Sequence, residues 1–110
     1  MGSAGRVSNQ MTMDPSTEGR ITVRFFATLR ELFGSTQTEV DAARAPDVAY
    51  LLDVICDSPQ RRDGLRQASG RLRKDIVLLV NGRNIAFLAG LDTPLTEGDS
   101  IDIFPPVFGG

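Results

Sequence analysis

The stretch Asp47-Val48-Ala49-Tyr50-Leu51-Leu52-Asp53-Val54-Ile55 predicts the principal helix and, with it, the class of the fold. Its apolar residues at positions i, i+3, i+4 and i+7 form a stripe along one face of a helix. Asp47 stands directly before the stripe, where an aspartate is a good N-cap. The sequence therefore predicts one amphipathic helix that needs an apolar surface to cover.

Two segments before this helix predict strands of that surface. In residues 20–26, Ile21, Val23 and Phe25 alternate with Thr22, Arg24 and Phe26, as in a half-buried strand. Residues 37–40 are short and compatible with a strand, so a hairpin back along the first strand is expected.

A short turn of helix is predicted between these two strands. Leu29, Leu32 and Phe33 have helical spacing, Thr28 is placed to cap the turn, and Gly34 is placed to end it.

A second, weaker helix is predicted after the principal one. Ser58 and Pro59 have the residue types of a cap and a first helical position. The apolar positions of this helix are Leu65, Ala68 and Leu72, and its interruptions are Gly64 and Gly70.

The second half of the chain predicts the remaining strands. Residues 76–80 are an apolar run expected to be buried on both faces if it is a strand, and Asn81-Gly82 is a strong hairpin signal. Residues 84–87 would form the returning arm.

The last strand is expected after the turn Glu97-Gly98-Asp99, with Ile101 and Ile103 facing one way. Pro105 and Pro106 end it because neither donates to a strand ladder.

This element order predicts an α+β architecture, with one main helix on one sheet and the first and last strands at its centre. Residues 1–19 have few apolar positions and are expected to be a disordered N-terminal extension. Residues 20–104 form the expected domain, and residues 105–110 form an extended tail.

Composition excludes several kinds of active site. Histidine is absent and cysteine occurs once among 110 residues. A histidine general base, a Ser/His/Asp triad, a histidine-ligated metal, an internal disulfide and a four-cysteine zinc site are therefore excluded.

Charge and hydropathy narrow the class of partner. Twelve basic and 14 acidic residues give a formal charge of -2, too balanced to indicate general binding to nucleic acid or anionic lipid. No apolar run approaches the roughly 20 residues of a membrane span, and the N-terminus does not resemble a secretion signal. We expect a cytoplasmic protein.

The tail Pro105-Pro106-Val107-Phe108-Gly109-Gly110 is the most informative segment. The prolines favour a stiff, extended start, and the glycines place no side chain near the carboxylate. At about 3.3–3.6 Å per residue, the tail reaches up to roughly 20 Å. The end of the chain is thus suited to entering a narrow site on another protein.

Several ordered motifs together resemble the MoaD/ThiS family of ubiquitin-like sulfur carriers, most closely its MoaD type. They are residues 23–32, the helix around 48–55, Val80-Asn81-Gly82, residues 91–99, and the paired prolines and glycines of the tail. The resemblance extends from Ile21 to Gly110.

The resemblance implies a β-grasp fold, with a mixed sheet packed on one main helix. It also implies that an ATP-dependent enzyme adenylates Gly110 and that sulfur from a persulfide replaces AMP, leaving a thiocarboxylate. The sulfur would then serve molybdopterin (molybdenum cofactor) biosynthesis. In this role the chain is a reagent rather than a catalyst, binds no cofactor or metal of its own, and leaves ATP to its activating partner.

The implied partners are a MoaE-like large subunit of molybdopterin synthase and a ubiquitin-activating-type (MoeB-like) adenylating enzyme. Gly110 would carry the thiocarboxylate or adenylate. The expected partner contacts are Gly109, Phe108, Val107, Pro106 and Pro105. Phe108 departs from the pattern, because many MoaD-like proteins have a small residue there.

Two alternatives remain open. The activated tail could instead form an isopeptide bond, as in a ubiquitin-like protein modifier, or deliver sulfur to tRNA or to another pathway. The length of the 57–75 segment resembles members in which such activities occur. In the other alternative the chain is a β-grasp binding module whose tail is chemically idle.

Other features have simpler interpretations. Cys56 is expected to be a small buried side chain near a helix end, and Asp92, Glu97 and Asp99 fit turn chemistry better than a calcium site. Phe26 is expected either to contact a partner or to lie under the helix. The sequence also contains one basic stretch, whose residues are given below. We interpret it as a solvated helix face, and the alternative is a docking patch for an acidic or RNA partner. That stretch comprises Arg61, Arg62, Arg66, Arg71, Arg73 and Lys74.

Overall fold

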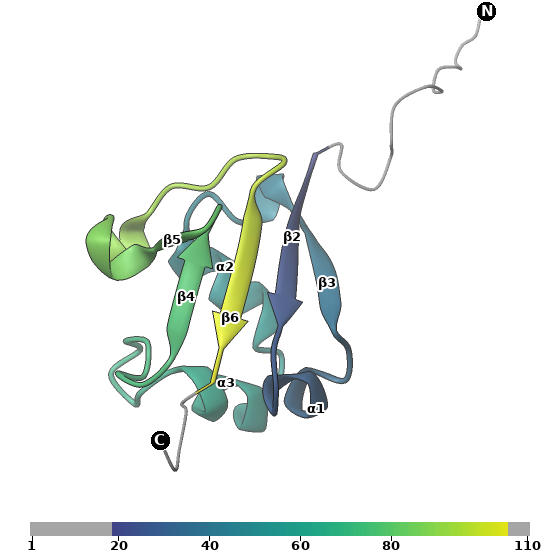
Figure 1. Cartoon of the computed structure of the whole chain (residues 1–110), viewed down its shortest axis with the longest axis vertical. Helices are drawn as coiled ribbons and strands as arrows, with labels where there is room; N and C mark the ends of the chain where they lie inside the picture. Colours follow the sequence, from purple (N-terminus) through teal and green to yellow (C-terminus); the bar gives the residue numbers. More distant parts are fainter. Residues whose placement is uncertain (1–18, 106–110) are drawn as a thin grey trace, which may run out of the picture.

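The computed structural model of the chain describes residues 19–105, which form one five-stranded sheet with helices against one face (Figure 1). The order of strands is β3-β2-β6-β4-β5. Their bounds are β2 Arg20–Phe25, β3 Gln37–Asp41, β4 Val77–Val80, β5 Arg83–Asn84 and β6 Ser100–Phe104. β6 is central, parallel to β2 and antiparallel to β4, so the prediction that the first and last strands form the centre is confirmed.

The principal helix α2 (Val48–Ile55) lies behind the sheet in Figure 1. All four residues of its predicted stripe are buried, and the Asp47 carboxylate accepts a hydrogen bond of 2.9 Å from the Tyr50 N–H, so both predictions are confirmed. The other helices are α1 (Leu29–Phe33), α3 (Pro59–Leu65) and the 3-10 turns η2 (Ala42–Arg44), η3 (Ile85–Phe87) and η4 (Gly90–Asp92). This is the mixed sheet on one main helix that a β-grasp fold requires.

The core lies between α2 and the inner face of the sheet. Ile21, Val23 and Phe25 of β2 and Ile101 and Ile103 of β6 are all buried. Each fully buried side chain of this kind contributes about 1.5–3 kcal/mol relative to an exposed one. The alternation predicted for the first and last strands is therefore what holds the sheet to α2.

The expectation that β4 is buried on both faces is wrong. Leu78 and Val80 are buried, whereas Leu79 is half-buried and Val77 is exposed. The reason is that no described element covers the outer face of the sheet, so only one side of the strand is enclosed.

The hairpin after β4 is confirmed, but its returning arm is shorter than expected. Asn81 and Gly82 both have positive φ, 51° and 84°, as the tight hairpin turn requires. β5 ends at Asn84, because the Asn84 side chain accepts a hydrogen bond from the Ala86 N–H and starts η3. The prediction of a strand over residues 84–87 therefore holds for Asn84 and is wrong for residues 85–87, which form η3.

The two short helices agree with the prediction in place but not in every detail. α1 ends at Gly34, whose φ of 73° is left-handed, but Thr28 makes no side-chain capping hydrogen bond. Ser58 does cap α3. α3 ends at Leu65, because Arg66 is extended and bridges to Leu72. The expectation of a helix continuing through Ala68 and Leu72 is wrong.

Part of the basic stretch ties these helices together instead of facing solvent. The Arg61 guanidinium donates to the carbonyl oxygens of Leu32 (3.0 Å) and Phe33 (3.3 Å) at the end of α1 and to Asp57 (2.9 Å). Arg66 is 13% exposed at its side chain and pairs with Asp53. For these two arginines, the interpretation as a solvated face is wrong.

Candidate functional site

The candidate site is the root of the C-terminal tail, where β6 ends. Phe104 closes this central strand and Pro105 follows it, so the tail begins at one end of the sheet. Pro105 is half-buried. Of the other predicted site residues, Pro106, Val107, Phe108, Gly109 and Gly110 lie outside the described residues.

Two aromatic rings pack together at this root. Phe26 and Phe104 stack with ring centroids 4.3 Å apart and an interplanar angle of 16°. The Arg30 guanidinium carbon lies 5.9 Å from the centre of the Phe26 ring, and Arg30 Nε donates to the Phe25 carbonyl oxygen. These contacts fix the backbone from which the tail leaves.

The stack lies on the outer face of the sheet. Phe104 pairs with Val77 of β4, and both alternate with inward-facing core residues. Phe26 follows Phe25, and the two rings face opposite sides: Phe25 stacks on buried Phe33. Of the two placements expected for Phe26, the one under the helix is wrong. The alternation of apolar and other residues along 20–26 already indicated that Phe26 points away from the core.

An ion pair continues this outer face. Arg24 Nε and one terminal nitrogen donate to the two carboxylate oxygens of Asp102, at 2.6 and 3.1 Å. The hydrogen bond to Asp102 and the charge of Asp102 raise the pKa of Arg24. The two charges compensate each other. The apolar side chains on this face, which no described element covers, are Phe26, Phe104, Val77 and Leu79.

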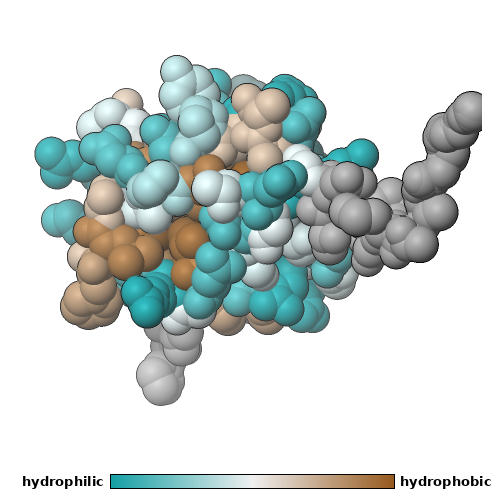
Figure 2. Space-filling view, turned by 90° about the horizontal axis from the view of Figure 1, so that it is seen from above, coloured by the Kyte–Doolittle hydropathy of each residue, from teal (hydrophilic) through white to brown (hydrophobic). Residues whose placement is uncertain are grey.

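A second exposed apolar patch lies at the other end of the sheet. Phe87 in η3 is 86% exposed, and Leu88 beside it is also exposed. Figure 2 shows apolar atoms gathered on the side where Figure 1 places η3 and η4. The pattern of residues 84–87 predicts a strand, so it gives no sign of this patch.

Cys56 is a structural residue at the end of α2. Its side chain is buried, and its thiol lies 3.6 Å from the Arg61 carbonyl oxygen. Burial is the main cause that raises the pKa of the Cys56 thiol to about 11. The prediction of a small buried side chain near a helix end is confirmed.

The acidic residues near β6 form turns, as expected. Asp99 accepts hydrogen bonds from the Asn81 amide and from the Thr96 N–H. In the described range 19–105, no group of three or more cysteine, aspartate or glutamate side chains is placed to hold a metal ion. The same range contains no helix with the length and apolar character that a bilayer crossing requires.

Comparison with known proteins adds family evidence to this geometry. The sequence profile of the ThiS family matches residues 23–110. The chain is 38% identical over 94 residues to small archaeal modifier protein 3 of Haloferax volcanii, covering 80% of this chain and 96% of the relative. It is 40% identical over 90 residues to the molybdopterin synthase sulfur carrier subunit of Escherichia coli, covering 82% and 99%.

Solved structures show the same fold. The solution structure of small archaeal modifier protein 1 from Methanosarcina acetivorans superposes with a TM-score of 0.72 at 31% identity, covering 84% of this chain and 97% of that one. The predicted ubiquitin-like β-grasp fold is therefore confirmed.

Proposed function

This chain belongs to the ThiS family of ubiquitin-like sulfur carriers and modifiers, and from that premise we propose that it carries sulfur on the carboxyl group of Gly110. The observation that carries the proposal is the root of the tail. The central strand ends in the Phe26–Phe104 stack on an uncovered face, and the family match continues from there to Gly110.

The chemistry needs activation, because a carboxylate is a poor acyl donor. The Gly110 carboxylate attacks the α-phosphorus of ATP on a MoeB-like adenylating partner, and pyrophosphate leaves. The terminal sulfur of a persulfide then attacks the acyl carbon, and AMP leaves. A thiol cleaves the resulting disulfide, and the thiocarboxylate remains on Gly110.

The chain itself supplies an unhindered acyl end and a surface beside it. Pro105 and Pro106 limit the directions available to the tail, while Gly109 and Gly110 add no side chain to the end that enters the partner's site. We assign Pro106, Val107 and Phe108 to contacts with that site. ATP binds the adenylating partner, since no glycine-rich segment of this sequence has the phosphate-cradling spacing.

We propose molybdopterin synthesis as the destination of the sulfur, with a MoaE-like large subunit as the second partner. The Escherichia coli relative, a molybdopterin synthase sulfur carrier subunit, supports this assignment. Its match covers 99% of that relative. The family profile matches residues 23–110, which include the tail as well as the domain.

A second candidate function is protein modification. The Haloferax volcanii relative is named a modifier, and its identity to this chain is similar, at 38%. In that case the activated Gly110 carbonyl forms an isopeptide bond with a lysine amine of another protein. Lys74 is the only lysine of this chain, so chains of linked copies would have to use that position.

Two measurements test the proposal and separate these destinations. ATP–pyrophosphate exchange by the adenylating enzyme of the native host should depend on the full chain and fall to background when the last two glycines are removed. Affinity purification of the chain from that host should then recover a molybdopterin synthase large subunit. Recovery of covalent adducts on lysines of other proteins would favour the modifier function. ATP–pyrophosphate exchange at the same rate with and without the chain would contradict both candidate functions.

A further inference from the structure

β3 is an open edge of the sheet. It pairs only with β2 among the described residues, and it ends the strand order on that side. Hydrogen bonds from Phe25 N–H to Thr36 O and from Ala42 N–H to Gly19 O set the alternation of the ladder. The same alternation turns the N–H and C=O groups of residues 37, 39 and 41 away from β2, toward a position that another strand would occupy.

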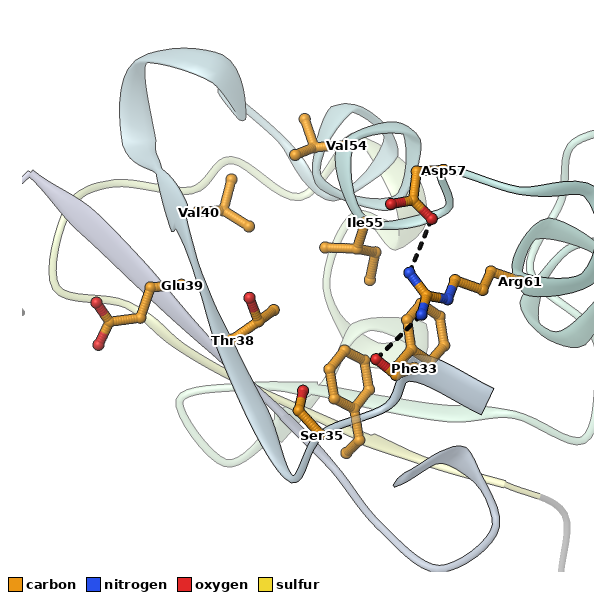
Figure 3. Close-up of a pocket in the computed structure, with 10 residues that line it drawn as sticks. Phe33, Ser35, Thr38, Glu39, Val40, Val54, Ile55, Asp57 and Arg61 are labelled. Carbon is orange, nitrogen blue, oxygen red and sulfur yellow. Dashed lines mark hydrogen bonds and ion pairs between the residues drawn. The ribbon is translucent and has the colours of Figure 1, made fainter. Parts of the chain in front are cut away.

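A hollow lies beside this edge, between β3 and α2. Figure 3 shows Val40 on β3 and Val54 and Ile55 on α2 around the same space, with the Asp57–Arg61 pair at one end. Its volume is about 170 Å³. Pockets that enclose whole small molecules measure about 300–1,000 Å³, so this one suits one or two aliphatic side chains rather than a cofactor.

The edge and the hollow together require an extended occupant. A strand laid along β3 would bond to its outward backbone groups and turn every second side chain toward Val54 and Ile55. A flexible small molecule satisfies only one of these two features.

Charge sets the flanks of that occupant. Two carboxylates, those of Glu39 and Asp57, and one guanidinium, that of Arg61, line the hollow, and the Asp57 side chain is 65% exposed. Glu39 also lies 3.5 Å from an Arg20 nitrogen, and this exposed pair offsets its charge only in part. Arg61 is already committed to Asp57 and to the end of α1. Acidic side chains on an open edge disfavour pairing with a second copy of the same edge and favour basic residues in the occupant.

We propose that the β3–α2 groove, formed by β3, Val54, Ile55, Asp57 and Arg61, binds an extended peptide segment of a partner protein. The segment has aliphatic residues at alternate positions and basic residues at its ends, and it adds as a sixth strand to the sheet. Neither Phe26 nor Phe104 lines this groove, so it is distinct from the root of the tail.

The probe is the capped peptide Lys-Val-Thr-Ile-Thr-Val-Lys, titrated into the isotope-labelled full chain and followed by NMR. We expect the amide signals of residues 37–41 and 54–55 to shift, with the Phe26–Phe104 region unchanged. Binding should weaken about tenfold or more in Val54→Lys, which places a cation and a longer chain in the groove. Tyr50→Lys is the matched control, because Tyr50 is exposed on the same helix and does not line the hollow.

Peptide variants test strand addition without changing the protein. N-methylation removes a donor from either the central isoleucine or the threonine next to it, and only one of these two N–H groups faces β3. One methylated peptide should therefore lose binding and the other keep it. The proposal would be overturned if both methylated peptides bound equally well, or if no amide signal shifted at millimolar peptide. It would also be overturned by shifts elsewhere on the molecule, by equal binding of a glutamate-flanked peptide, or by self-association of the chain through this edge.

Discussion

The residues that matter most for the proposed chemistry are those with the least side chain. Gly109 and Gly110 come two residues after a pair of prolines, and neither glycine adds a side chain near the acyl carbon. A β-carbon at Gly110 would stand directly beside the carbonyl that has to be attacked.

Gly110→Ala should leave the fold intact and slow sulfur transfer by about two orders of magnitude, the cost of a misplacement of about 1 Å at a reacting centre. Single-turnover assays with the partner enzymes measure the transfer, and the urea midpoint checks the fold. Transfer at the wild-type rate would contradict the role given to this residue.

Cys56 gives a residue-scale prediction about pH. Because burial raises the pKa of its thiol to about 11, the unfolded chain loses this proton at lower pH than the folded one. The free energy of unfolding should therefore fall as pH rises from about 9 to about 11.

Denaturant unfolding at pH 8 and pH 10.5 measures this effect, with Cys56→Ala as the comparison. The variant lacks the thiol and should lose less stability between the two pH values than the wild type does. Identical losses would show that the thiol titrates alike in both states.

At the scale of elements, α1 and α3 are joined by one side chain. Arg61 bonds two carbonyl oxygens at the end of α1, stacks over Phe33 at 5.5 Å and pairs with Asp57. Each hydrogen bond to a charged group contributes about 1.5–3 kcal/mol, less where water competes.

Arg61→Ala should lower the free energy of unfolding by about 2 kcal/mol, because it leaves the two carbonyl oxygens without this donor. Arg62→Ala is the control, since Arg62 is exposed on the same helix and should change stability by about 0.5 kcal/mol or less. Urea unfolding measures the free energy of unfolding of both variants. Equal values would show that the Arg61 hydrogen bonds contribute no more to stability than an exposed arginine does.

The sequence predicted elements well where one periodic pattern covered a whole segment. β2, α2 and β6 have such patterns, and each was placed correctly. The predicted α3 and β5 extend too far. α3 ends early because Arg66 bridges to Leu72, and β5 ends early because the Asn84 side chain caps the next turn. The roles of Arg61 and Arg66 were not predictable, because their partners are distant in the sequence or belong to the backbone.

At the scale of the whole molecule, the sheet has one face that encloses the core and one face that no described element covers. α2 covers the inner face, and the outer face keeps the Phe26–Phe104 stack beside the root of the tail. The fold class and the alternation of the first strand predicted two faces, whereas the stacking of two residues 78 positions apart required the structure.

Phe26→Ser should weaken binding to the adenylating enzyme about tenfold or more, as expected when an aromatic anchor at an interface is truncated. Tyr50→Ser is the matched control: it removes an exposed aromatic ring from α2, on the other side of the sheet. Calorimetric titration measures both affinities, and unfolding confirms that both variants are folded. Equal affinities would place the partner elsewhere.

We expect Gly110 to carry sulfur on its carboxyl group in the mature protein. The most direct measurement is the intact mass of the protein purified from its native host, with fragmentation that locates any change. We expect a population with one sulfur in place of one oxygen at Gly110. A chain that always retains further residues after Gly110, or that stays unmodified while its partner enzymes are active, would contradict it.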